Sequence, residues 1–267
     1  MPVLRIEKGW IHVRRIDTGT GVGDRPVLVL AHALGMDLRM WEPLLGALDG
    51  RIPVVVWDTL GHGLSALPAD GLTIDDQIDA LTALLDGLGI ARAVVGGISM
   101  GGMIALGSAA RGDPRIAGVV GMATALRFGD AAMWAARIAA VESGGLAAIT
   151  DQTMARWFAR RTHESRRDEI LAWRTLFARG YRPGYLANCR ALAEADLTAE
   201  ADRIRAPVLL LAGAEDPGPG PEPTAALADT LPHAQAVTIT DAAHLLAIDQ
   251  PQATADAVLD FVLRRVE

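Results

Sequence analysis

Ser99 lies in the sequence G-I-S-M-G at residues 97–101, which matches the pattern G-x-S-x-G. An apolar run at residues 93–97 leads into this pattern, and a helical pattern at residues 100–110 follows it directly. Strand, sharp turn and helix in this order are the context of a nucleophile elbow, in which glycines let strand and helix approach closely around a strained serine. A glycine-rich turn without chemistry would match the bare pattern too. The flanking elements favour a nucleophilic serine.

A serine is a weak nucleophile near neutral pH and needs a histidine as its base, with a carboxylate on the other ring nitrogen. Where the serine lies in an elbow of this kind, the carboxylate comes next along the chain and the histidine last. Asp216 follows an apolar run at residues 208–212, and His244 follows one at residues 236–239. We therefore predict that Ser99, Asp216 and His244 form a catalytic triad.

Two other carboxylates and one other histidine compete for these roles. Glu215 directly precedes Asp216 and is the first alternative for the acid, although it also suits a solvated loop. Asp241 is a weaker alternative and better suits a turn. His62, in the sequence D-T-L-G-H-G at residues 58–63, follows another predicted strand near the same edge. We expect His62 to brace loops there rather than to act as the base.

The negative charge that develops on an attacked carbonyl oxygen needs backbone N–H donors. One donor is expected from Met100, the residue after the nucleophile. The other is expected from the sequence A-H-A-L-G at residues 31–35, where an apolar run ends in a loop. Leu34 is favoured by its position, and Ala33 is the alternative.

The rest of the chain alternates strand and helix patterns. The strand patterns are apolar runs without alternation, which indicates a parallel sheet covered on both faces. A helix with one apolar stripe is predicted from Thr73, its N-cap, to Leu88. Residues 3–15, with Lys8-Gly9 at the middle, are predicted to form an antiparallel hairpin at the sheet edge. The predicted strands are 27–31, 54–57, 93–97, 116–122, 208–212 and 236–239, and the further helices are 38–48, 100–110, 224–231 and 251–265.

This alternation stops between residues 129 and 190, which are rich in Ala, Arg and Trp with helical spacing. We predict a helical cap there, inserted into an α/β core formed by residues 1–128 and 191–267. A doubly wound sheet binds ligands at the carboxyl ends of its strands, so the cap should cover that edge. The sequence P-G-P-G-P at residues 217–221 is predicted to be a turn-rich loop without a further role.

Composition argues against several classes of partner, and the partner expected is a small-molecule substrate. The chain has 267 residues and a formal charge of −7, which argues against nucleic acid. Cys189 is the single cysteine, so neither an internal disulfide nor a thiolate metal cluster is expected. No metal or other cofactor is expected, because no His, Cys and Asp cluster has metal-ligand spacing. Without a signal peptide or an apolar run of about 20 residues, a soluble cytoplasmic protein is expected, with no membrane partner. Nothing in the sequence indicates an oligomeric state.

Most of the chain resembles the 3-oxoadipate enol-lactonases, α/β-hydrolases of the β-ketoadipate branch of aromatic catabolism. The sequences D-T-L-G-H-G at residues 58–63 and G-I-S-M-G-G at residues 97–102 are similar to theirs, but many relatives share them. L-G-M-D-L-R-M-W at residues 34–41 resembles their segment after the first core strand. More specific are W-A-A-R-I, R-W-F and G-Y-L-A-N-C within the predicted cap. The resemblance implies the α/β-hydrolase fold, a doubly wound, mostly parallel sheet with an inserted helical cap. It also implies opening of a small carboxylated lactone through an acyl-enzyme.

Three segments depart from the lactonases. Leu60 stands where they usually have arginine, A-H-A at residues 31–33 replaces a sequence like S-N-S, and the stretch after Asp216 differs. The first two changes lie beside the predicted site and concern the substrate more than the chemistry, so a carboxylesterase with a related acid substrate stays an alternative. A C–C bond hydrolase or a cofactor-free perhydrolase would use similar elements. A non-catalytic binding module on the same fold is a further alternative, which an unbroken triad disfavours.

The predicted cap is cationic. Residues 129–190 contain ten arginines and six acidic residues, a net charge of +4 within a chain of −7. Arginines on solvated helix faces would explain this pattern, since the chain contains almost no lysine. A cationic cap would also attract an anionic substrate, and a guanidinium binds a carboxylate with two hydrogen bonds. By position, we expect Arg127 and Arg137 to bind the substrate carboxylate and Trp134 to form an apolar wall.

Overall fold

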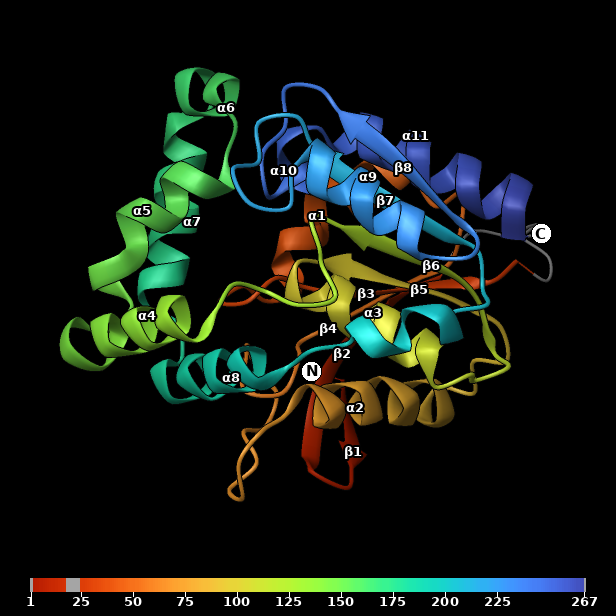
Figure 1. Cartoon of the computed structure of the whole chain (residues 1–267), viewed down its shortest axis with the longest axis horizontal. Helices are drawn as coiled ribbons and strands as arrows, with labels where there is room; N and C mark the ends of the chain where they lie inside the picture. Colours follow the sequence, from red (N-terminus) through yellow and green to blue (C-terminus); the bar gives the residue numbers. More distant parts are fainter. Residues whose placement is uncertain (1, 18–24, 267) are drawn as a thin grey trace.

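The structure is a computed structural model that describes residues 2–17 and 25–266. Its centre is a sheet in the order β1-β2-β4-β3-β5-β6-β7-β8 (Figure 1). β2 runs antiparallel to β1 and β4, whereas the other neighbouring strands are parallel. The doubly wound, mostly parallel sheet and its N-terminal edge hairpin are therefore confirmed. The strands are β1 (Val3–Ile6), β2 (Gly9–Ile16), β3 (Val27–Ala31), β4 (Val54–Trp57), β5 (Ala93–Ile98), β6 (Ile116–Met122), β7 (Val208–Gly213) and β8 (Ala234–Ile239).

Helices cover both faces of this sheet. α2 and α3 pack against each other on one face, and α1 packs against α11 on the other (Figure 1). Within the described ranges, no helix is both long and apolar enough to cross a membrane. The core helices are η1 (Leu38–Trp41), α1 (Glu42–Leu48), α2 (Ile74–Gly87), α3 (Met100–Ala110), η2 (Thr198–Arg203), α9 (Pro221–Thr230), α10 (Leu246–Asp249), α11 (Pro251–Phe261) and η3 (Val262–Val266).

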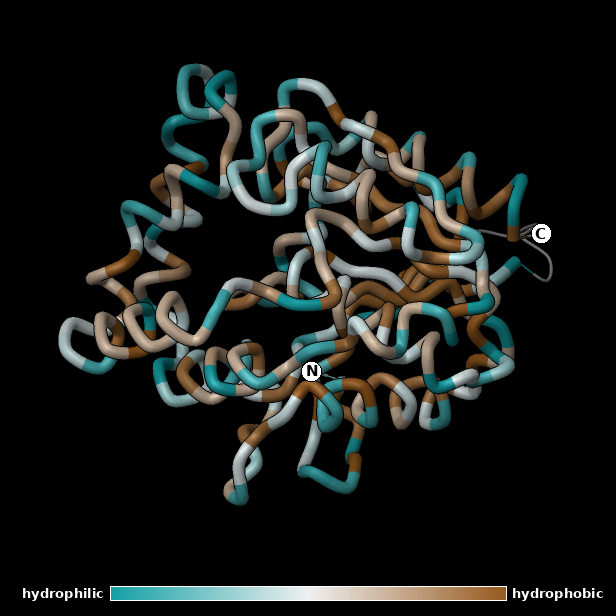
Figure 2. Tube along the Cα trace, in the orientation of Figure 1, coloured by the Kyte–Doolittle hydropathy of each residue, from teal (hydrophilic) through white to brown (hydrophobic). Residues whose placement is uncertain are grey.

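Burial explains why the central strands lack an alternating pattern. Every residue of β4 and β5 is buried, and hydrophobic residues concentrate along the central strands in Figure 2. The prediction of full burial is wrong for β8, where residues 236–238 are exposed. β8 is the last strand of the sheet and has a neighbour on one side only, so fewer groups cover it.

Local chemistry sets the helix starts. The Thr73 hydroxyl accepts the N–H of Asp76, and the Asp76 carboxylate accepts the N–H of Thr73. This capping box starts α2 where the sequence predicted it. α9 begins three residues earlier than predicted, at Pro221, because proline suits the first helical position, where an N–H would have no intrahelical partner.

The helices α4 to α8 lie between β6 and β7 in the chain and gather at the left of Figure 1. We refer to them as the cap. Its last helix extends to Glu194, so the expected boundary at residue 190 falls inside that helix. The cap helices are α4 (Ala131–Gly144), α5 (Ala147–Trp157), α6 (Arg160–Ser165), α7 (Arg167–Ala178) and α8 (Arg182–Glu194).

Asn188 of α8 fastens the cap to the core. Its fully buried amide donates to the carbonyl oxygens of Leu60 and Gly184, both at 2.9 Å. Its Oδ1 accepts a hydrogen bond from Gln77 of α2 at 2.8 Å. The backbones are in such close contact that a Cβ on Gly184 would lie 1.8 Å from the carbonyl oxygen of Gly61. The cap is therefore held against the core by buried polar contacts and by a glycine.

We expect Asn188→Ala to destabilise the protein by about 1–3 kcal/mol, because it leaves buried hydrogen-bonding groups without partners. Urea unfolding measures this as a lower midpoint. Gln252→Ala is the matched control, since among the described residues Gln252 bonds only to Asp256, on the exposed face of α11. Its effect should stay within about 0.5 kcal/mol. Equal midpoints for the two variants would contradict the proposed fastening.

Candidate active site

Ser99 forms the sharp turn between β5 and α3. Its backbone has φ 56° and ψ −117°, a strained conformation for a residue with a side chain. The turn is pressed against the end of β3: a Cβ on Gly97 would lie 2.4 Å from the Ala31 carbonyl oxygen, and one on Gly101 would lie 2.0 Å from it. Only glycine fits at these two positions. The packing therefore holds Ser99 in the conformation of a nucleophile elbow.

His244 and Asp216 form a buried pair. His244 Nδ1 lies 2.8 Å from Asp216 Oδ2, and the N–H of Gly218 donates to Asp216 Oδ1 at 2.9 Å. Burial acts to raise the pKa of Asp216, but the hydrogen bond and charge of His244 outweigh it and hold that pKa below its ordinary value. The ionised carboxylate keeps the proton on Nδ1 of His244. Nε2 is then left as a proton acceptor.

Ser99 and His244 line one cavity of about 300 Å³ between the core and the cap. The Ser99 hydroxyl has no hydrogen-bond partner among the described residues. The structure thus brings together Ser99, His244 and Asp216, which are far apart in the sequence. The cavity is also lined by Ala33, Leu34, Ala125, Arg127, Phe128, Gly129, Met133, Trp134, Arg137, Arg156, Trp157, Leu192, Gly218, Pro219 and Pro223.

The alternative carboxylates are engaged elsewhere. Glu215 accepts the N–H of Arg160, at the start of α6, at 2.8 Å. Asp241 pairs with Arg161 on the same helix at 3.3 Å. Neither carboxylate has a contact with His244 in the part of the chain that the structure describes. The geometry therefore favours Asp216 over both alternatives.

Beside Ser99, the backbone N–H groups of Leu34 and Met100 have no acceptor in residues 2–17 and 25–266. Leu34 lies in the loop after β3 and its N–H bonds to no described group, whereas the next N–H, of Gly35, donates to His62 Nε2. Met100 is the first residue of α3, where an N–H has no intrahelical acceptor. Ala33, the alternative to Leu34, also lines the cavity. Leu34 and Met100 are thus available as donors to a developing oxyanion.

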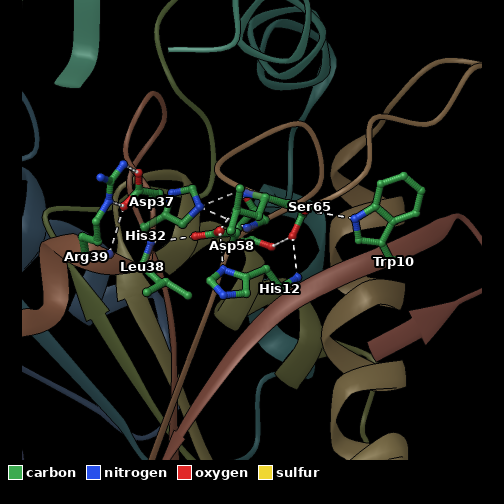
Figure 3. A network of polar contacts seen from close by, with 10 residues as sticks. Trp10, His12, His32, Asp37, Leu38, Arg39, Asp58 and Ser65 are labelled. Atoms are coloured by element: carbon green, nitrogen blue, oxygen red, sulfur yellow. Dashed lines mark hydrogen bonds and ion pairs between the residues drawn. The ribbon is translucent and has the colours of Figure 1, made fainter. Parts of the chain in front are cut away.

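Asp58 connects the loops around this site. Its Oδ1 accepts the N–H of Leu38, and its Oδ2 accepts the N–H of Leu64 and lies 2.8 Å from His12 Nδ1 (Figure 3). Ser65 adds a hydrogen bond from its hydroxyl to the Asp58 carbonyl oxygen at 2.6 Å. One buried carboxylate therefore joins β2, η1 and the loop after β4.

Five of the ten cap arginines pair with acidic residues at the surface, as solvated helix faces would. Arg127, at the exposed rim of the cavity, also pairs with Asp196 at 3.4 Å. The cap pairs are Arg160–Glu164, Arg161–Asp241, Arg166–Glu169, Arg174–Asp151 and Arg190–Glu142. The net charge of the cap is therefore mostly a surface feature, and only the arginines that line the cavity bear on its chemistry.

Two arginines remain directed at the cavity. Arg137 donates from Nε to the Tyr185 hydroxyl at 2.7 Å. Arg156 has no hydrogen-bond or ion-pair partner within the described ranges, and burial, aided by the charge of Arg137, lowers its pKa. Trp134 is buried beside them and donates its indole N–H to the Phe128 carbonyl oxygen. The sequence does not single out Arg156 as a cavity residue, because nothing in the spacing of the arginines separates it from those on the surface.

Two features near His244 were not predicted from the sequence. The loop at residues 217–221, predicted to have no role, contributes Gly218 and Pro219 to the cavity wall. Asp249 accepts with Oδ2 the N–H groups of Ala243 and, in the cap, Ala159, at 2.8 and 2.9 Å. Since His244 directly follows Ala243, this buried carboxylate ties the loop of His244 to the cap. No sequence pattern indicated the contact, because the three residues meet only in the fold.

A sequence profile described as the alpha/beta hydrolase family matches residues 28–257. The chain belongs to this family. The 3-oxoadipate enol-lactonase 2 of Acinetobacter baylyi is 34% identical over 92% of this chain and 91% of its own length. The crystal structure of an enol-lactonase from Burkholderia xenovorans matches with a TM-score of 0.92 at 34% identity, over 98% of this chain and 100% of that one. A thermophilic esterase from Thermogutta terrifontis, solved with malate bound, matches with a TM-score of 0.87 at 28% identity, over 99% and 98% of the two chains.

These similarities confirm both the α/β-hydrolase fold and the resemblance to the 3-oxoadipate enol-lactonases. They also place the chain among the enzymes that hydrolyse ester or lactone bonds. The predicted roles of individual residues in this hydrolase are open to direct tests by mutation.

We expect Ser99→Ala and His244→Ala each to lower kcat for an aryl ester by roughly four to six orders of magnitude, because nucleophile and base act as a unit. The double variant should be scarcely slower than either single variant. Circular dichroism should show unchanged folding. Near-normal turnover by folded Ser99→Ala would exclude Ser99 as the nucleophile.

Asp216→Asn should lower kcat by about 10⁴-fold, because an amide favours the wrong tautomer of His244. Glu215→Gln is the matched control, since Glu215 bonds to the cap, and it should cost less than about tenfold, the range of a single weak contact. Steady-state kinetics on an aryl ester measures both. The reverse ranking would assign the acid to Glu215.

Proposed function

We propose that this hydrolase opens a small carboxylated lactone, similar to 3-oxoadipate enol-lactone, through an acyl-enzyme on Ser99. The observation that carries the proposal is the shared cavity: Ser99 and His244 line it together with the cationic side chains of Arg137 and Arg156. Its volume of about 300 Å³ suits a small molecule. Two relatives at 34% identity are enol-lactonases, which supports the same substrate class.

In the first half of the reaction, His244 Nε2 accepts the Ser99 proton while Oγ attacks the lactone carbonyl. The N–H groups of Leu34 and Met100 stabilise the oxyanion. The intermediate collapses, the ring C–O bond breaks, and the departing enol oxygen takes the proton from His244. Asp216 stabilises the imidazolium that forms between these two proton transfers. The product of this half is an open-chain acyl-enzyme on Ser99.

In the second half, His244 removes a proton from a water molecule that attacks the acyl carbon. The new tetrahedral intermediate uses the same N–H donors, and Ser99 leaves with the proton that His244 returns. The released product carries the new carboxylate together with the one already present in the substrate. Throughout the cycle, Trp134 and Trp157 line the cavity as apolar walls.

We assign to Arg156 the role of binding the carboxylate that the substrate already carries. An unpaired guanidinium in a partly buried position is costly unless an anion compensates it. Arg137 lies close enough to depress its pKa, so the two cations add their potentials in the cavity. A carboxylate placed there would accept charge-assisted hydrogen bonds. This revises the sequence-based expectation, in which Arg127 and Arg137 had that role.

A carboxylesterase acting on a monoester of a small dicarboxylic acid is the second candidate. The triad geometry serves open and cyclic esters equally, and the related esterase from Thermogutta terrifontis was solved with malate, a dicarboxylate. Both candidates share the carboxylate subsite. The proposal further includes a place in aromatic catabolism and a cytoplasmic location, which the resemblance to the enol-lactonases supports.

We expect kcat/KM for a carboxylated enol-lactone to exceed that of its methyl ester by roughly tenfold or more, which is about 1.4 kcal/mol. Arg156→Met should remove most of this preference for the acid. Added salt should reduce the ratio of the two kcat/KM values, because it screens the attraction between the carboxylate and the arginines. The matched control is Arg174→Met, because Arg174 pairs with Asp151 on the cap surface, and it should retain the preference.

Equal turnover of acid and methyl ester by the wild type would refute the carboxylate subsite. Turnover of monoesters but of neither lactone would establish the esterase instead.

A further inference from the structure

Two buried histidines stand behind the loop that carries Leu34. His32 directly follows β3 and His62 lies in the loop after β4; their exposures are 0% and 5%. Their ring centroids are 5.0 Å apart in an edge-to-face arrangement. His62 does not line the cavity of Ser99 but faces a separate cleft, which it lines together with Gly35 and Tyr185. Neither imidazole therefore reaches the reacting atoms.

The neighbours of the two rings define their protonation. The N–H of Gly35 donates to His62 Nε2 at 2.9 Å, and the N–H of Thr59 donates to His32 Nε2 at 3.0 Å. A ring nitrogen that accepts a hydrogen bond carries no proton, so each ring is protonated at Nδ1. Burial lowers the pKa of both rings, and His32 lowers that of His62 further, while Asp37 and Asp58 act in the opposite direction on His32. The contacts thus describe two neutral imidazoles.

Further contacts surround the two rings. The Asn188 amide nitrogen lies 3.4 Å from His62 Nδ1, but it donates its hydrogens to the carbonyl oxygens of Leu60 and Gly184. His32 Nδ1 donates to the carbonyl oxygen of Ala33 at 2.8 Å. The Thr59 hydroxyl lies 3.1 Å from His62 Nδ1 and 3.2 Å from His32 Nε2, so it can accept from one ring and donate to the other. Each nitrogen of both rings has a partner of the matching kind. Figure 3 shows His32 beside Asp37 and Asp58, with dashed lines to its neighbours.

The Ala33 carbonyl and the Leu34 N–H belong to the same peptide group. That group is planar and trans, so its C=O and N–H point in opposite directions. The N–H of Met36 donates to the same carbonyl oxygen at 3.0 Å. The hydrogen bond from His32 helps to hold this carbonyl and therefore also helps to set the direction of the N–H. It polarises the amide as well, which makes the N–H a stronger donor. On the other side of Leu34, His62 holds the next peptide group through the N–H of Gly35.

We propose that His32 and His62 are positioning residues that aim and polarise the Leu34 N–H as an oxyanion donor. His32 acts on the peptide that carries this N–H, and His62 prevents the following peptide from turning. The A-H-A sequence at residues 31–33, which departs from the lactonases, thus supplies a side-chain donor for the loop. The proposal rests on the proposed acyl-enzyme chemistry but not on the identity of the lactone.

The test compares affinity for an oxyanion mimic with affinity for a ground-state ligand. A trifluoromethyl ketone adds to the serine and places an oxyanion in the hole, whereas glutarate binds without one. We expect His32→Leu to lower kcat for an aryl acetate by roughly ten- to a hundredfold, part of the cost of losing one donor. The inhibition constant of the ketone should rise by a similar factor. KM and the affinity for glutarate should change less than about twofold, since neither depends on the oxyanion.

Conservative variants separate this role from a structural one. His32→Asn keeps an N–H near the Nδ1 position, so it should retain most of the turnover and of the ketone affinity. His62→Gln can still accept from Gly35, whereas the shorter His62→Asn cannot reach it and should resemble His32→Leu. Val258→Ala, in α11, is a control for lost stability alone and should leave the ketone affinity unchanged.

Unchanged ketone affinity in folded His32→Leu, or an equal loss in Val258→Ala, would overturn the proposal. If His32→Leu does not fold, His62→Gln and His62→Asn provide the test. Equal ketone affinities of these two variants would overturn the proposal. Failure of the ketone to inhibit the wild type would instead refute the acyl-enzyme chemistry itself.

Discussion

The contact between the Ser99 turn and the end of β3 is the constraint on which the site depends. Gly97 and Gly101 approach the Ala31 carbonyl so closely that any side chain there would overlap with it. β3 and β5 are neighbours in the parallel sheet, with Ala31 opposite Gly97. The strained serine and the loop after β3 are thereby forced to the same point. Ser99 and the predicted oxyanion donors lie together because the backbones of two adjacent strands end in contact.

Around this contact, buried polar groups hold segments that have no regular hydrogen bonding of their own. Asp58 secures the start of η1, His32 and His62 secure the loop before it, and Asn188 secures α8. Loops at the carboxyl ends of strands cannot satisfy their backbone groups within a ladder, so side chains must do so. Asn188 and Asp249 also fix the cap relative to the core. A change of cap orientation would break several of their hydrogen bonds together.

The arginines of the cap fall into two groups with different surroundings. Arginines on the cap surface pair with acidic neighbours in water, where such pairs contribute little to stability. Arg137 and Arg156 face a cavity with apolar walls, where an unpaired charge has a much larger effect. The specificity proposed for the site therefore comes from the two cations that the fold removes from water, and the net charge of the cap is a poor guide to it.

Much of the fold and the chain order of the candidate triad could be predicted from the sequence. The strands 27–31, 54–57 and 116–122 and the helix 100–110 begin and end where predicted, because buried parallel strands and the elbow impose short-range patterns on the chain. β8 was misjudged, since a run of apolar residues does not reveal which strand lies at the edge. Asp216 and Glu215 are adjacent in sequence, and only the direction of each side chain in the folded loop separates them.

The roles that depend on long-range contacts were decided by the tertiary structure. Arg156 is one arginine among ten in the sequence of the cap and became a site residue only because its neighbours leave it unpaired in the cavity. Asp249 accepts the N–H of Ala159 in the cap, and His32 accepts the N–H of Thr59 in the loop after β4; no local pattern encodes either contact. Sequence alone determines which chemistry is available and in what order it follows along the chain. Burial and partner choice, which decide how each group behaves, arise only when distant segments pack together.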